Sequence, residues 1–113
     1  MSRIKWTYTL PAAIAAALDT KSVTLVELTA GEEMMATKRA MNDPIRLAWE
    51  MPKESLRAVN GVELSAADGS IDKAWETMHP KARSFVMAAY NQLHNPAQDD
   101  ISVFLQSRQA EVV

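Results

Sequence analysis

The segment LRAVNGVEL, residues 56–64, carries the strongest local signal in the chain. Asn60 and Gly61 separate two short apolar segments. Asn-Gly is the preferred pair for a two-residue hairpin loop, because both positions of that loop need a positive φ. We therefore predict a β-hairpin centred on Asn60-Gly61, which the rest of the chain must cover with further strands and helices.

Two more strands are predicted before this hairpin. In KWTYTL, residues 5–10, Trp6 and Tyr8 alternate with polar residues, which is the pattern of a half-buried strand. SVTLVEL, residues 22–28, is rich in β-branched residues and predicts a second strand, antiparallel to the first. The alanine-rich segment between them, residues 12–18, fits either a short helix or a buried connection.

The segment LTAGEEMMATKRAM, residues 28–41, predicts a helix with a well-defined start. Thr29 and Glu32 have the spacing of a capping box, in which each side chain accepts a hydrogen bond from the other residue's backbone N–H. A second helix is expected to begin at Asp43, followed by a proline at the first helical position. We expect it to end before Pro52, because proline disfavours helical backbone at the residue that precedes it.

The C-terminal half is predicted to be helical, because its apolar residues recur at helical spacing. The residues expected to face the core are Ile71, Ala74, Trp75 and Met78 in one helix, Ala82, Phe85, Ala89 and Leu93 in the next, and Ile101, Phe104 and Leu105 in the last. The predicted fold class is α+β and mostly helical. Short N-terminal antiparallel strands and the hairpin around Asn60-Gly61 pack with about four to five helices in a single domain, residues 1–113.

Composition and charge exclude several classes of function. The net charge is −2 and the basic residues are scattered, whereas a nucleic-acid-binding surface normally shows a basic cluster. The chain has no cysteine, which excludes disulfides and thiolate sites. No segment approaches the ~20 apolar residues of a membrane span. We therefore expect a cytoplasmic protein with no nucleic-acid and no membrane partner.

No catalytic, cofactor-binding or metal-binding residue is predicted. DGSIDKAWE, residues 68–76, places oxygen-bearing side chains at alternate positions, as calcium loops do, but Lys73 stands where such a loop needs glycine. The two histidines, His79 and His94, lie beside helix boundaries and lack metal-ligand spacing. We expect no enzymatic activity and no cofactor.

The methionines are the unusual feature of the composition. The chain has 7 of them, and several cluster in the first helical region. A single methionine there is best explained as a flexible filler of the core. The cluster fits equally well an adaptable apolar surface for a partner's helix, because the unbranched thioether conforms to varied shapes. The residues assigned to this partner-binding surface are Met34, Met35, Lys38, Met41, Ile45 and Trp49.

Three segments together resemble the tail assembly chaperones of long-tailed bacteriophages. The segments are VTLVELTAGEEMMATKRAM (23–41), LRAVNGVEL (56–64) and AWETMHPKARSFVMAAYNQLHNPAQDDISVFLQS (74–107). They are similar to the family's pattern of a strand, an ELT-x-x-EE helix, a V-[ND]-G-V hairpin and a helical C-terminal half. The resemblance covers most of the chain.

The resemblance implies a non-enzymatic phage or prophage protein that binds the tape measure protein, a long helical chain. In the cytoplasm of the bacterial host it would keep that chain soluble while the tail tube assembles. No binding residue can be carried over, since the family has no fixed binding motif. The alternative is a small structural virion protein, a tail-tip or baseplate subunit held in the virion tail. Other tail proteins, and further copies of this chain in a homo-oligomer, remain candidate partners.

Overall fold

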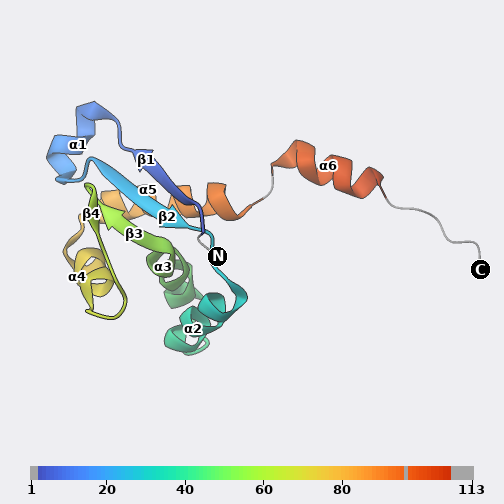
Figure 1. Cartoon of the computed structure of the whole chain (residues 1–113), viewed down its shortest axis with the longest axis horizontal. Coiled ribbons are helices and arrows are strands. Elements are labelled where there is room, and N and C mark those ends of the chain that lie inside the picture. The colour runs from blue at the N-terminus through green and yellow to red at the C-terminus, as the bar shows by residue number, and fades with distance from the viewer. Residues whose placement is uncertain (1–2, 96, 108–113) are drawn as a thin grey trace, which may run out of the picture.

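The computed structural model describes residues 3–95 and 97–107 (Figure 1). The elements in chain order are β1 (Lys5–Thr9), α1 (Ala12–Leu18), β2 (Ser22–Val26), α2 (Ala30–Ala40), α3 (Pro44–Ser55), β3 (Leu56–Val59), β4 (Val62–Glu63), α4 (Ser70–Thr77), α5 (Pro80–His94) and α6 (Gln98–Gln106). The strands form a four-stranded antiparallel sheet. The predicted fold class, α+β and mostly helical, is confirmed. The alanine-rich segment between the first two strands is the helix α1.

The sheet has the strand order β1-β2-β3-β4, so each strand pairs with its neighbour in the chain. β1 and β2 pair along their whole length, with Lys5 opposite Val26 at one end. This confirms the predicted antiparallel pair. Between β2 and β3 the register shifts at Thr24/Leu25. Irregularities of this kind bend a strand and increase its twist, which helps a small sheet to curve around the helices beneath it.

The predicted hairpin turn is present. Asn60 has a φ of 54° and Gly61 a φ of 80°, and Val59 pairs with Val62 across the turn. The Asn60 side chain also reaches the loop before β2, where its Oδ1 accepts a hydrogen bond from the Lys21 backbone N–H at 2.6 Å. The hairpin is therefore fixed both by its own backbone and by the neighbouring loop.

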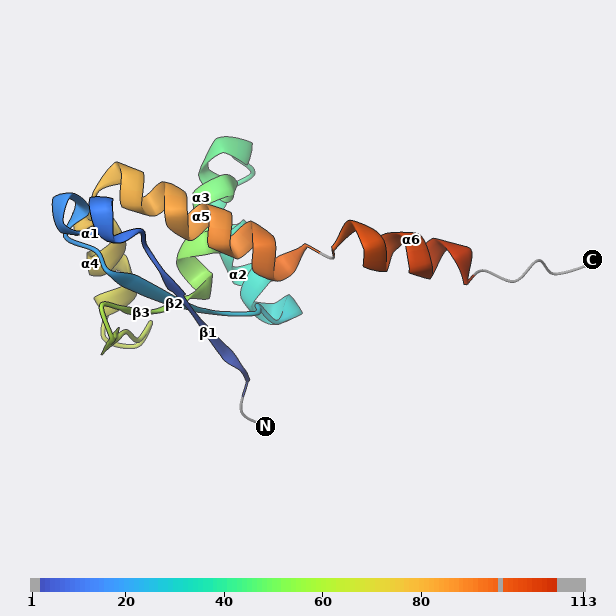
Figure 2. The same cartoon turned by 90° about the horizontal axis from the view of Figure 1, so that it is seen from above.

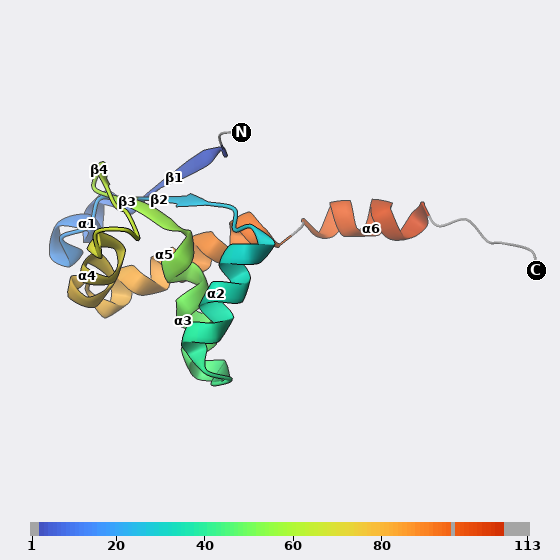
Figure 3. The ribbon, with the colours of Figure 1, turned by 60° about the horizontal axis from the view of Figure 1, so that its bottom comes forward.

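One face of the sheet carries the core. Val23 and Leu25 of β2 and Leu56 of β3 are buried in one cluster with Trp75 of α4 and Val86 of α5. Figure 3 shows α2, α3, α4 and α5 on the same side of the sheet. Figure 2 shows α1 and α4 at one end of the sheet, with α6 extending away from the opposite end.

Helices α2 and α3 form a helical hairpin below the sheet (Figure 3). The predicted capping box at its start is confirmed: the Glu32 N–H donates to Thr29 Oγ1 at 3.2 Å, and the Thr29 N–H donates to Glu32 Oε1 at 3.0 Å. At the tip of the hairpin, Met41 and Asn42 have φ values of 52° and 64°, which reverse the chain. Asp43 then caps α3, as predicted.

The predicted end of α3 is wrong. The helix continues through Pro52 and ends at Ser55. Pro52 is fully buried, and the Ser55 hydroxyl donates a hydrogen bond to the Val26 carbonyl at 2.5 Å. These contacts with the body of the protein offset the cost of a proline inside the helix, which disfavours helical backbone at Met51 and removes one backbone hydrogen bond.

Two predicted core faces in the C-terminal half also differ from the structure. In α5 the core position is taken by Val86, while Phe85 lies at the surface. In α6, Phe104 is 72% exposed and Leu105 60% exposed, so the prediction that they face inward is wrong. The reason is the position of α6, which follows the extended residue Asn95 and stands away from the other elements (Figure 1).

Candidate functional site

A hollow of about 560 Å³ lies where α3, α4 and α5 meet. We call it the apolar groove. It is lined by Pro44, Ile45, Ala48 and Trp49 from α3, Trp75 from α4, and Pro80, Arg83, Ser84 and Met87 from α5. Apart from one arginine and one serine, every side chain in this lining is apolar. The groove therefore offers a concave surface to an apolar ligand or segment.

The inner wall of the groove is held rigidly by Trp75 and Arg83. Trp75 is buried, and the Arg83 guanidinium lies 5.6 Å from the centroid of its ring, where a cation–π interaction stabilises it. Arg83 also donates hydrogen bonds to the carbonyls of Trp75 at 2.8 Å and Glu76 at 3.0 Å. Because these side chains are already ordered, binding in the groove costs less conformational entropy.

A second hollow of about 330 Å³ lies on the other side of α3. It shares Pro44, Ala48 and Met87 with the apolar groove and continues along α5 to Tyr90. Helices α3 and α5 pack against each other (Figure 3), and Met87 of α5 lines both hollows together with Pro44 and Ala48 of α3. The contact between the two helices separates the two hollows.

The structure divides the predicted partner-binding residues into two groups. Ile45 and Trp49 line the apolar groove. The others, on α2 and at its C-terminal end, lie outside the lining: Met34, Met35, Lys38 and Met41. All six residues are exposed, and the apolar ones range from 43% for Trp49 to 75% for Met41. The three methionines therefore do not fill the core, and their part in binding remains a prediction.

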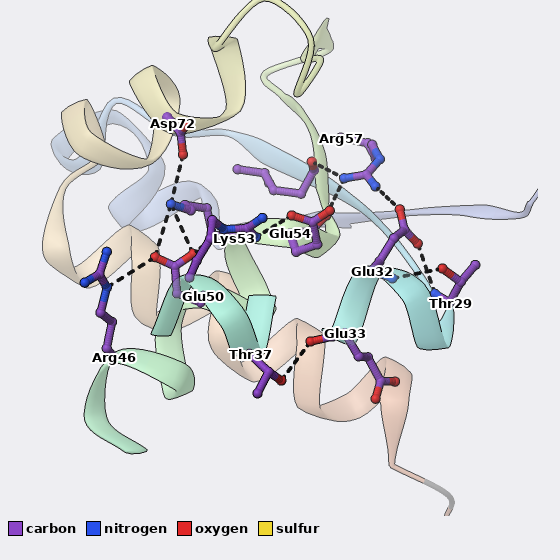
Figure 4. A network of polar contacts seen from close by, with 12 residues as sticks. Thr29, Glu32, Glu33, Thr37, Arg46, Glu50, Lys53, Glu54, Arg57 and Asp72 are labelled. Carbon is purple, nitrogen blue, oxygen red and sulfur yellow. Dashed lines mark hydrogen bonds and ion pairs between the residues drawn. The ribbon is translucent and has the colours of Figure 1, made fainter. Parts of the chain in front are cut away.

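A network of ion pairs links α2, α3 and α4, and the last two of these helices line the groove (Figure 4). Glu50 of α3, with a side chain 4% exposed, pairs with Arg39 of α2 at 3.0 Å and with Lys53 at 3.3 Å. Lys53 also pairs with Asp72 of α4 at 2.9 Å. Burial alone would raise the pKa of Glu50, but the hydrogen bond from Arg39 and the charge of Lys53 lower it below its usual value. Glu50 therefore stays ionised at neutral pH and links α3 to α2, while Lys53 links α3 to α4.

A second network is centred on Glu32, at the start of α2. Both carboxylate oxygens accept hydrogen bonds from Arg3, and Oε2 also accepts one from Arg57 Nη2 of β3 at 2.9 Å. Burial raises the pKa of Glu32, but the bonds from Arg3 and the Thr29 N–H, together with the arginine charges, lower it to about 2. Figure 4 shows Glu32 between Thr29 and Arg57. This carboxylate holds α2 against the sheet.

The sequence missed the half of the groove that α4 and α5 supply. Trp75 is predicted as a core residue, and it is buried, yet it also lines the groove. Pro80, Arg83 and Met87 join the site only because α3 packs against α5 beside them. Nothing in the local spacing of these residues marks them as part of one surface.

No family model, curated protein or solved structure matches the chain. In the part of the chain that the structure describes, no group of acidic or histidine side chains is placed to hold a metal ion. Across residues 3–95 and 97–107, no helix is long and apolar enough to cross a membrane. The apolar groove and the exposed residues of α2 are therefore the structural features that bear on function.

Proposed function

We propose that this chain is a phage or prophage tail assembly chaperone. It binds an apolar helical segment of the tape measure protein and keeps that protein soluble in the host cytoplasm, without making or breaking a covalent bond. The observation that carries the proposal is the apolar groove, which is open to the surface and bounded by three helices. Grooves between helices accept the apolar face of an amphipathic helix from another chain. The tape measure protein is chosen as the partner because residues 23–41, 56–64 and 74–107 resemble the tail assembly chaperone family.

The exposed methionines of α2 extend the proposed binding surface. Met34, Met35 and Met41 present flexible thioethers that adjust to different apolar surfaces, as a chaperone of a long chain requires. Charged side chains on the same helix, including Glu33 and Lys38, are exposed and keep the free protein soluble. An apolar surface with a charged border is typical of a reversible protein contact.

Co-expression with the tape measure protein of the same phage tests the proposal. We expect the tape measure protein to become soluble and to co-purify with this chain. Ile45→Glu places a charge in the groove that a bound apolar segment would have to bury, and it should lower the co-purified amount by at least about tenfold. Val62→Glu on β4 is the matched control, because Val62 is 65% exposed, close to the 74% of Ile45, and lies outside the groove.

The proposal fails if the tape measure protein stays insoluble beside the wild-type chain, or if the Ile45 and Val62 variants behave alike. Both side chains are solvent-exposed, so neither substitution disturbs the core. Comparison of the two variants therefore measures the groove and not the stability of the fold.

One observation favours the second candidate, a small structural protein of the virion tail. The apolar side chains of α6 are exposed, which suits a subunit that remains permanently packed among others. Mass spectrometry of purified particles separates the two functions. An assembly chaperone is absent from mature virions, whereas a tail-tip or baseplate subunit is present in a fixed ratio to the other tail proteins.

A further inference from the structure

Helix α6 presents an apolar stripe that the body of the protein does not cover. None of the residues from Gln98 to Gln106 is buried. Ile101, Phe104 and Leu105 follow the spacing i, i+3, i+4, so they share one side of the helix. Figures 1 and 2 show α6 extending beyond the end of α5 with no other element beside it.

A helix as short as α6 needs a surface to pack against. It has 9 residues and no side-chain hydrogen bond at its N-cap. Isolated helices shorter than about 12–15 residues are only marginally stable in water. The apolar stripe of α6 therefore has to be covered if the helix is to persist.

The apolar groove suits α6 in shape and in charge. A helix of 9 residues is about 14 Å long, and the groove is bounded by helices that leave an apolar channel open to the surface. The first turn of α6 carries Asp99 and Asp100. Arg83 lines the groove and donates hydrogen bonds only to backbone carbonyls, so its positive charge is not neutralised by them. The neighbouring Arg46 pairs with Glu50 at 3.8 Å. These opposite charges favour an orientation with the first turn of α6 near Arg83.

The residues on either side of the α5–α6 connection direct α6 away from the groove of its own chain (Figure 1). Only residues 95–97 separate the two helices. Asn95 (φ −100°, ψ 129°) and Ala97 (φ −63°, ψ 148°) are both extended, so they lead the chain away from α5 instead of reversing it. Pro96 favours this state, because proline disfavours helical backbone at the preceding residue.

A fold-back of α6 would also meet the wrong surface. It would first reach the second hollow near Tyr90, and α3 lies between that hollow and the apolar groove. The start of α2 is close to this point, because the Leu28 backbone N–H donates a hydrogen bond to His94 Nε2 at 2.9 Å. Glu33 lies in the first turn of α2, and burial together with the Glu33 charge raises the pKa of the Tyr90 hydroxyl. Asp99 and Asp100 would be brought against a like charge there.

We propose that α6 of one copy of this chain lies in the apolar groove of a second copy, and that the exchange is reciprocal. Two copies related by a twofold axis cover both α6 stripes and both grooves, which closes the assembly as a dimer. The inference rests on the groove that the proposed function also uses. If the chain is a chaperone, α6 of the second copy covers the groove until a tape measure segment displaces it.

Sedimentation velocity of the purified full-length chain, without any tape measure protein, tests the exchange. We expect a dimer for the wild type. Phe104→Glu should raise the dimer dissociation constant by more than about 100-fold, because a symmetric dimer loses both contacts at once. Val103→Glu is the matched control, because Val103 is 67% exposed on the opposite side of α6. It should change the constant by less than about threefold.

A mixing experiment then identifies the contact. Ala48→Glu places a charge in the groove and leaves α6 intact. Phe104→Glu places a charge on the apolar stripe of α6 and leaves the groove intact. We expect each variant alone to be monomeric, and an equimolar mixture to form dimers through one intact α6 and one intact groove. A monomeric wild type, equal effects of the Phe104 and Val103 variants, or a mixture that stays monomeric would each overturn the proposal.

The two proposals can fail separately. A monomeric chain that still solubilises the tape measure protein overturns only the exchange of α6. A dimer with the expected response to Phe104→Glu that does not solubilise the tape measure protein overturns only the chaperone function.

Discussion

Glu32 makes a specific prediction about stability in acid. Its pKa is about 2 in the folded protein, against an ordinary value of 4.5, because Arg3, Thr29 and Arg57 stabilise the carboxylate. A lowered folded-state pKa contributes stability that is fully present above the unfolded pKa of 4.5 and is lost as the pH falls towards 2. Glu32→Gln should remove this part of the pH dependence.

The magnitude follows from the pKa difference of Glu32. The difference, 4.5 − 2 = 2.5, corresponds to roughly 3.4 kcal/mol in the free energy of unfolding. At pH 3, roughly 2 kcal/mol of this is lost. The Glu32 side chain is 22% exposed and that of Arg3 is 38% exposed, so solvent screening reduces the expected loss to about 1 kcal/mol.

Urea unfolding at pH 6 and pH 3, followed by far-ultraviolet circular dichroism, measures this difference for each variant. Glutamine suits the capping box as well as glutamate does, so Glu32→Gln removes the charge and keeps the cap. We expect the wild type to lose about 1 kcal/mol more than Glu32→Gln between the two pH values. Glu63→Gln is the control, since Glu63 is 85% exposed and 4.0 Å from Lys5.

The control variant should show the same pH dependence as the wild type. If Glu32→Gln also loses as much stability as the wild type between pH 6 and pH 3, the two arginines do not hold the Glu32 carboxylate, and the account of its pKa is wrong.

Three further predictions concern stability measured by thermal unfolding. Gly61→Ala should destabilise the protein by about 1 kcal/mol, because Gly61 has a φ of 80° that alanine adopts only with strain. Gly31→Ala should instead stabilise the protein, by about 0.5 kcal/mol, because alanine favours helix more than glycine does. The new Cβ in α2 would meet only Thr29 Oγ1, at 3.9 Å. Glu50→Gln should destabilise the protein by about 2 kcal/mol, because Arg39 and Lys53 lose their shared carboxylate; an unchanged melting temperature would show that the network does not hold the helices together.

The exposure of α6 and of the α2 methionines bears on how the chain behaves on its own. Both surfaces are apolar and both lie outside the core. A free monomer therefore exposes two apolar surfaces that its own fold does not cover, which favours association with another chain. The proposed exchange of α6 and the proposed binding of a tape measure segment would both cover the apolar groove.

The sequence alone determined the features that depend on residues close together in the chain. The turn at Asn60-Gly61 follows from the positive φ that both positions need. The capping box of Thr29 and Glu32 follows from their spacing. In each case a few adjacent residues have one favourable local conformation, and the surrounding structure preserves it.

Only the tertiary structure decided which surfaces meet. The continuation of α3 through Pro52 depends on contacts made by the end of that helix. The groove exists because the packing of α3 against α5 brings Ile45 beside Trp75 and Met87. The stripe that contains Phe104 shows that α6 has an apolar side, yet no residue of α6 is buried against the core of its own chain. Periodicity reports that a helix has an apolar face, and the partner of that face depends on elements distant in the chain or on another molecule.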